Sequence, residues 1–279
     1  MLRRLLTGAF EDPEIADQLE RLPIEFGGHG VDRFGISRHA LLRFYSAMAP
    51  LYRNYLKVTV FGGENIPART RGLIVGNHSG GIGADAMMVS VALLLNDPPR
   101  LAHAMAEYFF NTKPYAGLAL NRVGHLTGLP EHARLLLEDE RLVLVFPEGA
   151  RGALKPYAKA YQLQTFGTGF MRLALANKAP VVPFAFIGGE ESFPILARID
   201  LRKWLGTPPM PIAPQLVLWP LPISCQVHFG PPIHFEGTGA EPQHVIDGYV
   251  RQVKDAIEGL IERGLSIRPR AFTTERVEG

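Results

Sequence analysis

The sequence predicts an α/β fold, in which a largely parallel central sheet is flanked by helices and preceded by an N-terminal helical segment. Two observations predict this class. Short runs of apolar and β-branched residues have the length of buried strands; they lie at 73–76, 101–105, 142–146 and 180–187. Segments with helical apolar spacing separate these runs; they cover 86–95, 131–141 and 166–177. Strands that alternate with helices are typical of βαβ units, whose sheets are parallel and covered on both faces.

Residues 1–56 are predicted to form the N-terminal helical segment. A helix is expected over 13–22, and Ser37 precedes a second one over 38–55 that Pro50 kinks or splits. The second helix carries apolar and aromatic residues interleaved with three arginines, Arg38, Arg43 and Arg53. This pattern is typical of a helix that packs on a sheet, and also of a basic, aromatic helix at a lipid interface. Both interpretations stay open, so membrane contact by this segment is an expectation.

Residues 57–265 are predicted to form one domain, and residues 266–279 a mobile tail. Short strands are expected over 57–61 and 225–229. The clearest helix is expected over 241–264, because Pro242 lies in its first turn and Gly264 is placed to end it. The apolar residues of this helix share one face, so it should cover the sheet.

The composition limits the classes of function. The net charge of +2 and the pI near 8.7 are only mildly basic, which argues against a nucleic-acid partner. The single cysteine, Cys225, excludes an internal disulfide, and no Cys/His cluster has the spacing of metal ligands. No metal is therefore expected, and a reducing, cytoplasmic setting fits. The first residues do not have the pattern of a secretory signal, and no apolar run is long enough to span a bilayer, so we expect any membrane contact to be peripheral or monotopic.

The first candidate site is a histidine at the end of a predicted strand. The apolar run 73–75 ends in Asn77-His78, passes through a glycine-rich loop and reaches Asp85 at the start of the next helix. An imidazole at a strand's carboxyl end, with a carboxylate close enough to hold its Nδ1–H, has the geometry of a general base. Many His–Asp pairs are structural, so this motif alone leaves both interpretations open.

A second motif favours chemistry. Another apolar strand ends in Phe146-Pro147-Glu148-Gly149-Ala150-Arg151. The two motifs together resemble the signatures of the glycerolipid acyltransferases, the family that includes lysophosphatidic acid and glycerol-3-phosphate acyltransferases. Their signatures are Asn-His-x4-Asp and Phe-Pro-Glu-Gly-Thr-Arg. Here Ala150 replaces the threonine, and the loop between His78 and Asp85 is two residues longer.

The resemblance implies an O-acyltransferase that moves a fatty acyl group onto the hydroxyl of a lysophospholipid or related glycerolipid. The donor would be acyl-CoA or acyl-carrier protein, both co-substrates, and no cofactor is expected. The expected setting is the cytoplasmic face of a membrane.

The chemistry assigns a role to each candidate residue. His78 is the expected base, and Asp85 would fix its tautomer. The backbone of Gly80, Gly81 and Gly83 could present N–H groups to an oxyanion, or the glycines could simply permit the turn. A thioester is already activated, so no covalent serine is needed, and Ser79 is too close in sequence to His78 to serve as one. By resemblance, the acceptor would be bound with the help of the turn at Glu148 and Gly149, and Arg151 would reach a phosphate, although an arginine there could also be a solvated surface charge.

The chain departs from the family in its second block, Gly-x-x-Phe-x-x-Arg. The corresponding stretch, 124–130, contains neither the phenylalanine nor the phosphate-binding arginine, and Arg122 is the nearest cation that could substitute. This departure favours lysophospholipids with larger headgroups, or neutral acceptors such as mono- and diacylglycerol, over glycerol phosphate.

Two rival functions and one unassigned segment remain open. The same site could hydrolyse acyl thioesters if His78 activates water, or the chain could be a catalytically silent lipid-binding protein. Residues 205–235 contain eight prolines and no formal charge. Apart from its strand, this stretch is predicted to be an apolar loop, which would pack on the surface, dip into a membrane or cover an acyl tunnel.

Overall fold

A seven-stranded sheet forms the centre of the protein. The computed structural model describes residues 11–79, 83–106, 114–199, 210–213, 219–268 and 271. The strand order is β1-β9-β6-β2-β5-β3-β4. The strands span Thr59–Phe61 (β1), Gly72–Gly76 (β2), Ala102–Ala106 (β3), Leu126–Thr127 (β4), Leu142–Val145 (β5), Val181–Ile187 (β6) and Gln226–Phe229 (β9). All neighbouring pairs are parallel except β6 and β9, so β1 and β9 run against the other five strands. The predicted fold class is confirmed.

The two faces of the sheet are both apolar, as a parallel sheet between helices requires. Along β2, Leu73 and Val75 point to one face and Ile74 to the other, because successive side chains of a strand alternate. The register places Ile74 between Leu144 of β5 and Val182 of β6, and these three residues belong to the same core cluster. The sheet is therefore the middle layer of three.

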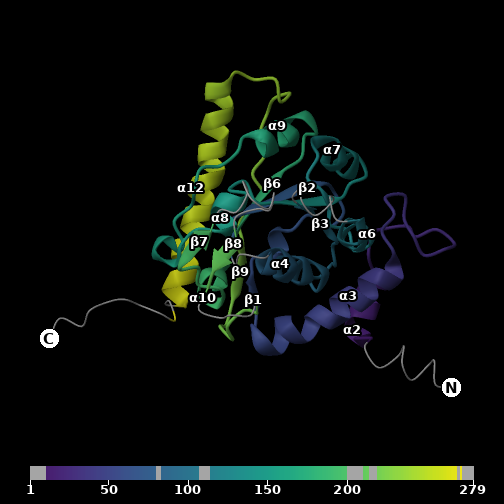
Figure 1. Cartoon of the computed structure of the whole chain (residues 1–279). Coiled ribbons are helices and arrows are strands. Elements are labelled where there is room, and N and C mark those ends of the chain that lie inside the picture. Colours follow the sequence, from purple (N-terminus) through teal and green to yellow (C-terminus); the bar gives the residue numbers. More distant parts are fainter. Residues whose placement is uncertain are drawn as a thin grey trace.

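Helices form the two outer layers (Figure 1). One face is covered by α2 (Pro13–Glu20), α3 (Arg38–Pro50) and α4 (Ala84–Leu94). The other is covered by α7 (Pro130–Glu138), α9 (Gly169–Ala176) and α12 (Gln243–Ile267). Shorter elements lie around the sheet: α6 (Pro114–Arg122), α8 (Ala150–Ala153), α10 (Gly189–Ser192), and the two-stranded sheet of β7 (Ala197–Ile199) and β8 (Met210–Ile212).

The described part of the N-terminal segment packs on the sheet. The side chain of Ser37 caps α3 by accepting from the N–H of Ala40, and after Pro50 the chain continues as a π-helical turn over Leu51–Tyr55. Leu41 and Tyr45 of α3 are fully buried in the core cluster that also contains sheet residues. Of the two interpretations of helix 38–55, this observation matches the one in which the helix packs on the sheet. Lipid contact by this segment stays a prediction.

The end of α12 differs from the prediction. Gly264 does not end the helix, which continues to Ile267. The reason is packing: a Cβ at Gly264 would lie 2.6 Å from Cγ1 of Ile187, so glycine permits close approach of α12 to β6. The boundary placed at residue 265 falls inside this helix. Beyond it, Arg268 forms an ion pair with Glu191, and most residues of the predicted tail lie outside the described residues.

The proline-rich stretch 205–235 also differs in part from its prediction. Residues 210–212, expected in a loop, form β8, which pairs antiparallel with β7 in a separate two-stranded sheet. Pro211 is tolerated there because β8 has only one partner strand. Residues 219 and 220 pack near the end of the π-helical turn, where the hydroxyl of Tyr55 donates to the carbonyl of Pro220 at 2.9 Å. Residues 205–209 and 214–218 lie outside the described residues.

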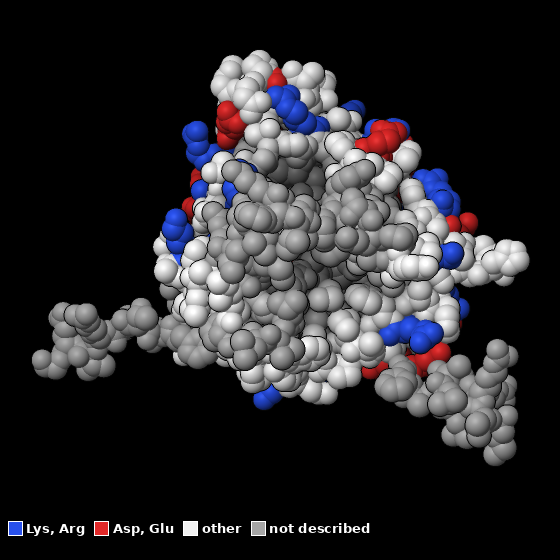
Figure 2. Space-filling view, in the orientation of Figure 1, with Lys and Arg blue, Asp and Glu red and all other residues white. Residues whose placement is uncertain are grey.

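The described surface carries both signs of charge. Figure 2 shows Lys and Arg side chains interspersed with Asp and Glu around this face. Several of these charges form ion pairs, such as that of Arg134 with Glu131 and Glu138 on α7. Over the described residues, no helix is both long enough and apolar enough to cross a bilayer.

Candidate active site

The site lies beyond the carboxyl ends of three adjacent strands. His78 follows β2, Glu148 follows β5 and Glu190 follows β6. Because these strands are neighbours and parallel, their ends meet at one edge of the sheet, which is where ligands bind in α/β folds. The topology thus brings together residues that are far apart in the sequence.

His78 and Asp85 form a direct pair. The Nδ1 of His78 lies 2.7 Å from Oδ2 of Asp85. A carboxylate can only accept, so Nδ1 carries the proton and Nε2 is left as the basic nitrogen. Asp85 is fully buried and also accepts the N–H groups of Ser79 at 2.6 Å and Ala86 at 2.8 Å. The two extra residues in the loop therefore do not prevent Asp85 from reaching the imidazole.

The imidazole is held on its ring face as well. It stacks on Phe146, with ring centroids 4.3 Å apart, and 17% of the His78 side chain remains exposed. Burial lowers the pKa of His78, but the charge of Asp85, its hydrogen bond and the more distant charge of Glu148 outweigh burial, so the pKa is raised above its usual value. An oriented, partly accessible imidazole of raised basicity is suited to accept a proton.

The side chain of Glu148 contacts the main chain of His78. Its Oε1 accepts the N–H of His78 at 2.9 Å, and its Oε2 accepts the N–H of Gln164 at 2.7 Å. The carboxylate is buried. Because both oxygens are engaged by backbone donors, Glu148 supports the position of His78 in this structure. Its expected part in binding the acceptor stays a prediction.

Two glycines make the turn around Glu148 possible. Gly149 has φ +56° and ψ −149°, a conformation that side chains rarely adopt. A Cβ at Gly152 would lie 2.6 Å from Cβ of Glu148. The Pro-Glu-Gly motif is therefore needed for backbone geometry as well as for its charge.

Asn77 fixes the end of β2 to β6. Its side-chain amide donates to the carbonyl of Phe186 at 3.0 Å and its amide oxygen accepts the N–H of Phe186 at 2.7 Å. This role was not predicted from the sequence. The hydroxyl of the next buried residue, Ser79, has no hydrogen-bond partner among the described residues.

Lys155 and Glu190 complete the buried polar cluster, and sequence reasoning missed both. The ammonium of Lys155 lies 3.0 Å from Oε1 of Glu190 and 3.7 Å from Oε2 of Glu148. In the sequence each is a charged residue among mostly apolar neighbours, and the two are 35 positions apart. That pattern alone does not indicate that they are in contact.

The other residues predicted for the site include Arg151 and the three glycines of the loop between His78 and Asp85. Arg151 is exposed on α8 next to the Glu148 turn, and donates to the carbonyl of Thr165 at 3.3 Å. Gly83 is the N-cap of α4 with φ +81°. Gly80 and Gly81 lie outside the described residues, so their expected oxyanion role stays a prediction.

Arg122 is not brought to the site. It ends α6, and its carbonyl accepts the N–H of Ser37 at the start of α3. Two residues later, the carbonyl of Gly124 lies 3.1 Å from Nδ1 of His103, near the amino end of β3. The backbone of Arg122 therefore lies toward the amino ends of the strands, whereas His78 lies beyond their carboxyl ends.

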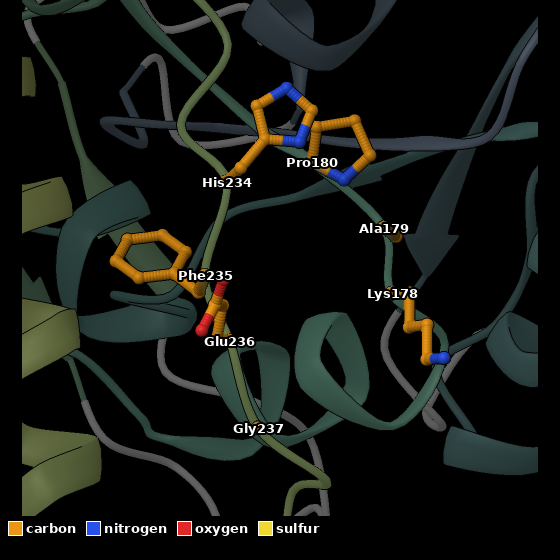
Figure 3. Close-up of a pocket in the computed structure, with 7 residues that line it drawn as sticks. All are labelled: Lys178, Ala179, Pro180, His234, Phe235, Glu236 and Gly237. Atoms are coloured by element: carbon orange, nitrogen blue, oxygen red, sulfur yellow. The ribbon is translucent and has the colours of Figure 1, made fainter.

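A surface pocket of about 290 Å³ (Figure 3) has none of the predicted site residues in its lining. It is lined by residues 178–180 and 234–237, and Pro180 directly precedes the amino end of β6. Within the described residues, no group of three or more His, Cys, Asp or Glu side chains is placed to hold a metal ion.

Residues 57–187 match the sequence profile of a family described as Acyltransferase. An uncharacterised protein of Mycobacterium tuberculosis is 34% identical over 266 residues, covering 88% of this chain and 72% of the relative. A human protein, named DGAT1/2-independent enzyme synthesizing storage lipids, is 24% identical over 228 residues, covering 81% of this chain and 67% of the relative.

The fold is also similar to a crystal structure of the 1-acyl-sn-glycerophosphate (LPA) acyltransferase PlsC from Thermotoga maritima. The TM-score is 0.52 at 17% identity, and the match covers 80% of this chain and 82% of that one. The chain belongs to the acyltransferase family and is a divergent member of it.

Proposed function

We propose that this member of the acyltransferase family is an O-acyltransferase that moves a fatty acyl group from a thioester donor to the hydroxyl of a lysophospholipid or related glycerolipid. The donor is acyl-CoA or acyl-carrier protein. The observation that carries the proposal is the 2.7 Å contact between Nδ1 of His78 and Asp85, at the strand edge that also holds the Pro-Glu-Gly turn.

In the proposed mechanism His78 is the general base. Its Nε2 takes the proton of the acceptor hydroxyl as the oxygen attacks the thioester carbonyl. The charge of Asp85 stabilises the imidazolium that forms. The tetrahedral intermediate then expels the thiolate, which takes the proton back from the imidazolium. One ester bond forms and one thioester bond breaks, so no covalent enzyme intermediate and no cofactor are needed.

We propose that the acceptor is either a lysophospholipid with a larger headgroup or a neutral acylglycerol, which has no headgroup. The stretch 124–130 lacks the arginine of the family's phosphate-binding block, and the backbone of Arg122 lies toward the amino ends of the strands. Of the two cations predicted to meet a phosphate, only Arg151 is next to the Glu148 turn. The human relative is named for synthesising storage lipids, so neutral acylglycerols belong among the acceptors to be tested.

A peripheral position on the cytoplasmic face of a membrane would bring both substrates to the site. Support comes from exposed apolar side chains on three parts of the described surface. Tyr115 and Leu118 are exposed on α6, Leu196 and Ile212 are exposed at the β7–β8 sheet, and Trp219 is exposed at the end of the π-helical turn. Amphipathic surfaces of this kind bind the interface between headgroups and acyl chains.

The proposal is tested by thiol release from a long-chain acyl-CoA, with and without acceptors presented in mixed micelles. The panel should contain lysophosphatidic acid, lysophosphatidylcholine, monoacylglycerol and diacylglycerol, with the esterified product identified by mass. Release that depends on an acceptor and yields the ester is expected. Release at the same rate without any acceptor would identify a thioesterase instead, and lipid binding without turnover would identify a binding protein.

A further inference from the structure

The buried cluster behind His78 contains a lysine whose ammonium faces two carboxylates. Lys155 follows α8, and its residue is only 4% exposed. Its ammonium lies 3.0 Å from Oε1 of Glu190, 3.7 Å from Oε2 of Glu148 and 3.5 Å from the carbonyl of Gln162. A lysine is almost never fully buried unless it is paired, so this charge is held by its two carboxylate neighbours.

Lys155 supplies the counter-charge that Glu148 needs. Glu148 accepts two backbone N–H groups, from His78 and from Gln164, and an ionised carboxylate is the stronger acceptor for both. A buried charge without a partner is costly, so the carboxylate needs a cation beside it. The ammonium of Lys155 places a positive charge 3.7 Å from Oε2 of Glu148 and so helps to hold the carboxylate where it accepts these two hydrogen bonds.

Glu190 holds the lysine in place from the next strand. It belongs to α10, directly after β6, and its Oε1 accepts the N–H of Tyr161 at 3.3 Å in addition to the ammonium. Burial raises the pKa of Glu190 while Lys155 opposes that rise. The chain of contacts thus runs from β6 through Glu190, Lys155 and Glu148 to the backbone of His78 at the end of β2.

We propose that Lys155 is a positioning residue for acyl transfer: through Glu148 it fixes the main chain of His78 and so the place of the imidazole. This inference rests on the proposed function for its kinetic consequence. A displacement of about 1 Å in a reacting group can reduce a rate about 100-fold, so a lysine that touches no substrate can still control turnover.

The test compares two variants of the full-length protein. Lys155→Met would leave Glu190 as an unpaired buried carboxylate, so K155M/E190Q removes the ion pair as a unit and protects the fold. Lys159→Met is the matched control, because Lys159 is an exposed lysine on the same connection. Thermal unfolding confirms that each variant is folded before it is assayed.

The first readout is the exchange rate of the backbone N–H of His78, which donates to Oε1 of Glu148. It is followed by NMR of histidine-labelled protein, assigned with His78→Asn, and it needs no substrate. If Lys155 holds Glu148 in place, this hydrogen bond weakens in K155M/E190Q, and the amide is expected to exchange at least about 10-fold faster than in wild type. In K159M the amide should exchange as in wild type. An unchanged exchange rate of the His78 amide in K155M/E190Q would overturn the inference.

The second readout is kcat, measured with each variant in the wild-type and Glu148→Gln backgrounds. K155M/E190Q should lower kcat by about 10- to 100-fold with the donor KM within about threefold of wild type. In the Glu148→Gln background the same change should cost less than about threefold, because the two residues act in series. An equal loss in both backgrounds would contradict the inference. If wild type shows no acceptor-dependent turnover, the proposed function fails, whereas the exchange rate of the His78 amide still decides the role of Lys155.

Discussion

At the scale of single residues, the pairing of His78 with Asp85 decides which imidazole nitrogen can act. Asp85 makes three contacts, with the ring of His78 and with two backbone N–H groups, so its side chain has little freedom. Glu148 fixes the main chain of the same histidine from the other side. The base is therefore oriented by one carboxylate through its ring and by a second through its peptide group.

Replacement of Asp85 by asparagine should impair both the orientation and the basicity of His78. An amide cannot accept all three donors, so kcat is expected to fall by about 10²- to 10⁴-fold. Asp85 raises the pKa of His78, so the acid limb of the pH–rate profile should also move to lower pH in D85N. Asp255→Asn, on the exposed face of α12, is the control. A D85N enzyme with the wild-type pH profile would show that Asp85 does not govern the base.

At the scale of secondary-structure elements, α12 and β6 approach each other through Gly264. The buried residues of α12 recur at helical spacing and face the sheet; they are Ile246, Val250, Val253, Ile257, Ile261 and Gly264. The last of them leaves room for Ile187 at the carboxyl end of β6, two residues before Gly189 and α10 begin. The helix therefore helps to place the strand end that carries Glu190.

Two alanine substitutions in α12 should have opposite effects. Gly264→Ala would place its Cβ 2.6 Å from Ile187, and overpacking costs about 1–3 kcal/mol, more than the gain of about 1 kcal/mol from helix propensity. Gly259→Ala has open space around its Cβ and should stabilise by about 0.5–1 kcal/mol. Urea unfolding measures both. Equal stabilisation by the two variants would show that α12 does not pack closely at Gly264.

The sequence pattern predicted most elements but not their directions. Alternation of buried runs and amphipathic segments was sufficient for β2, β5 and β6 and for the helices α4, α7 and α9, because their spacing follows from the geometry of strand and helix. The reversed direction of β1 and β9 could not be predicted, since the residues of a short apolar strand do not encode which neighbour it pairs with. The same limit applies to Gly264, whose role depends on a residue 77 positions earlier.

The site was predictable to the extent that its residues are close in sequence. His78 and Asp85 lie seven residues apart, and a strand end followed by a helix start was enough to bring them together. Lys155 and Glu190 come from the segments that follow β5 and β6, and they meet only because both strands flank β2. Arg122 was expected at the site, but its backbone lies near the amino end of β3, whereas His78 lies beyond the carboxyl end of β2.

At the scale of the whole molecule, two buried histidines link stability to pH. His103 lies in β3 and His125 just before β4, and the ring of His125 packs edge-on against Phe44 of α3. Burial lowers the pKa of His103 to about 3, with a contribution from the charge of Arg141, and lowers the pKa of His125 to about 4. Both are neutral in the folded protein over the range in which unfolded histidines become protonated.

The protein should therefore lose stability on mild acidification. Each folded pKa is below the unfolded value of about 6.5, so the contribution is present above pH 6.5 and is lost as pH falls toward 4, by up to about 1.4 kcal/mol per pH unit for each histidine. The free energy of unfolding at pH 7.5 and 5.0 should differ more in wild type than in H103Q/H125Q. His78, whose pKa is raised, contributes in the opposite sense and cancels in this comparison. Equal pH dependence of the two proteins would contradict the assignment.

The central claim, that His78 is the base of an acyl transfer, is tested most directly by ester formation in His78→Ala. Wild type and variant should be compared at saturating donor and acceptor, with the acceptor that gives the fastest wild-type rate and after thermal unfolding has shown that both are folded. The rate of ester formation is expected to fall by about 10²- to 10⁴-fold, the usual contribution of a positioned general base. A variant that still forms the ester within about threefold of the wild-type rate would contradict the account.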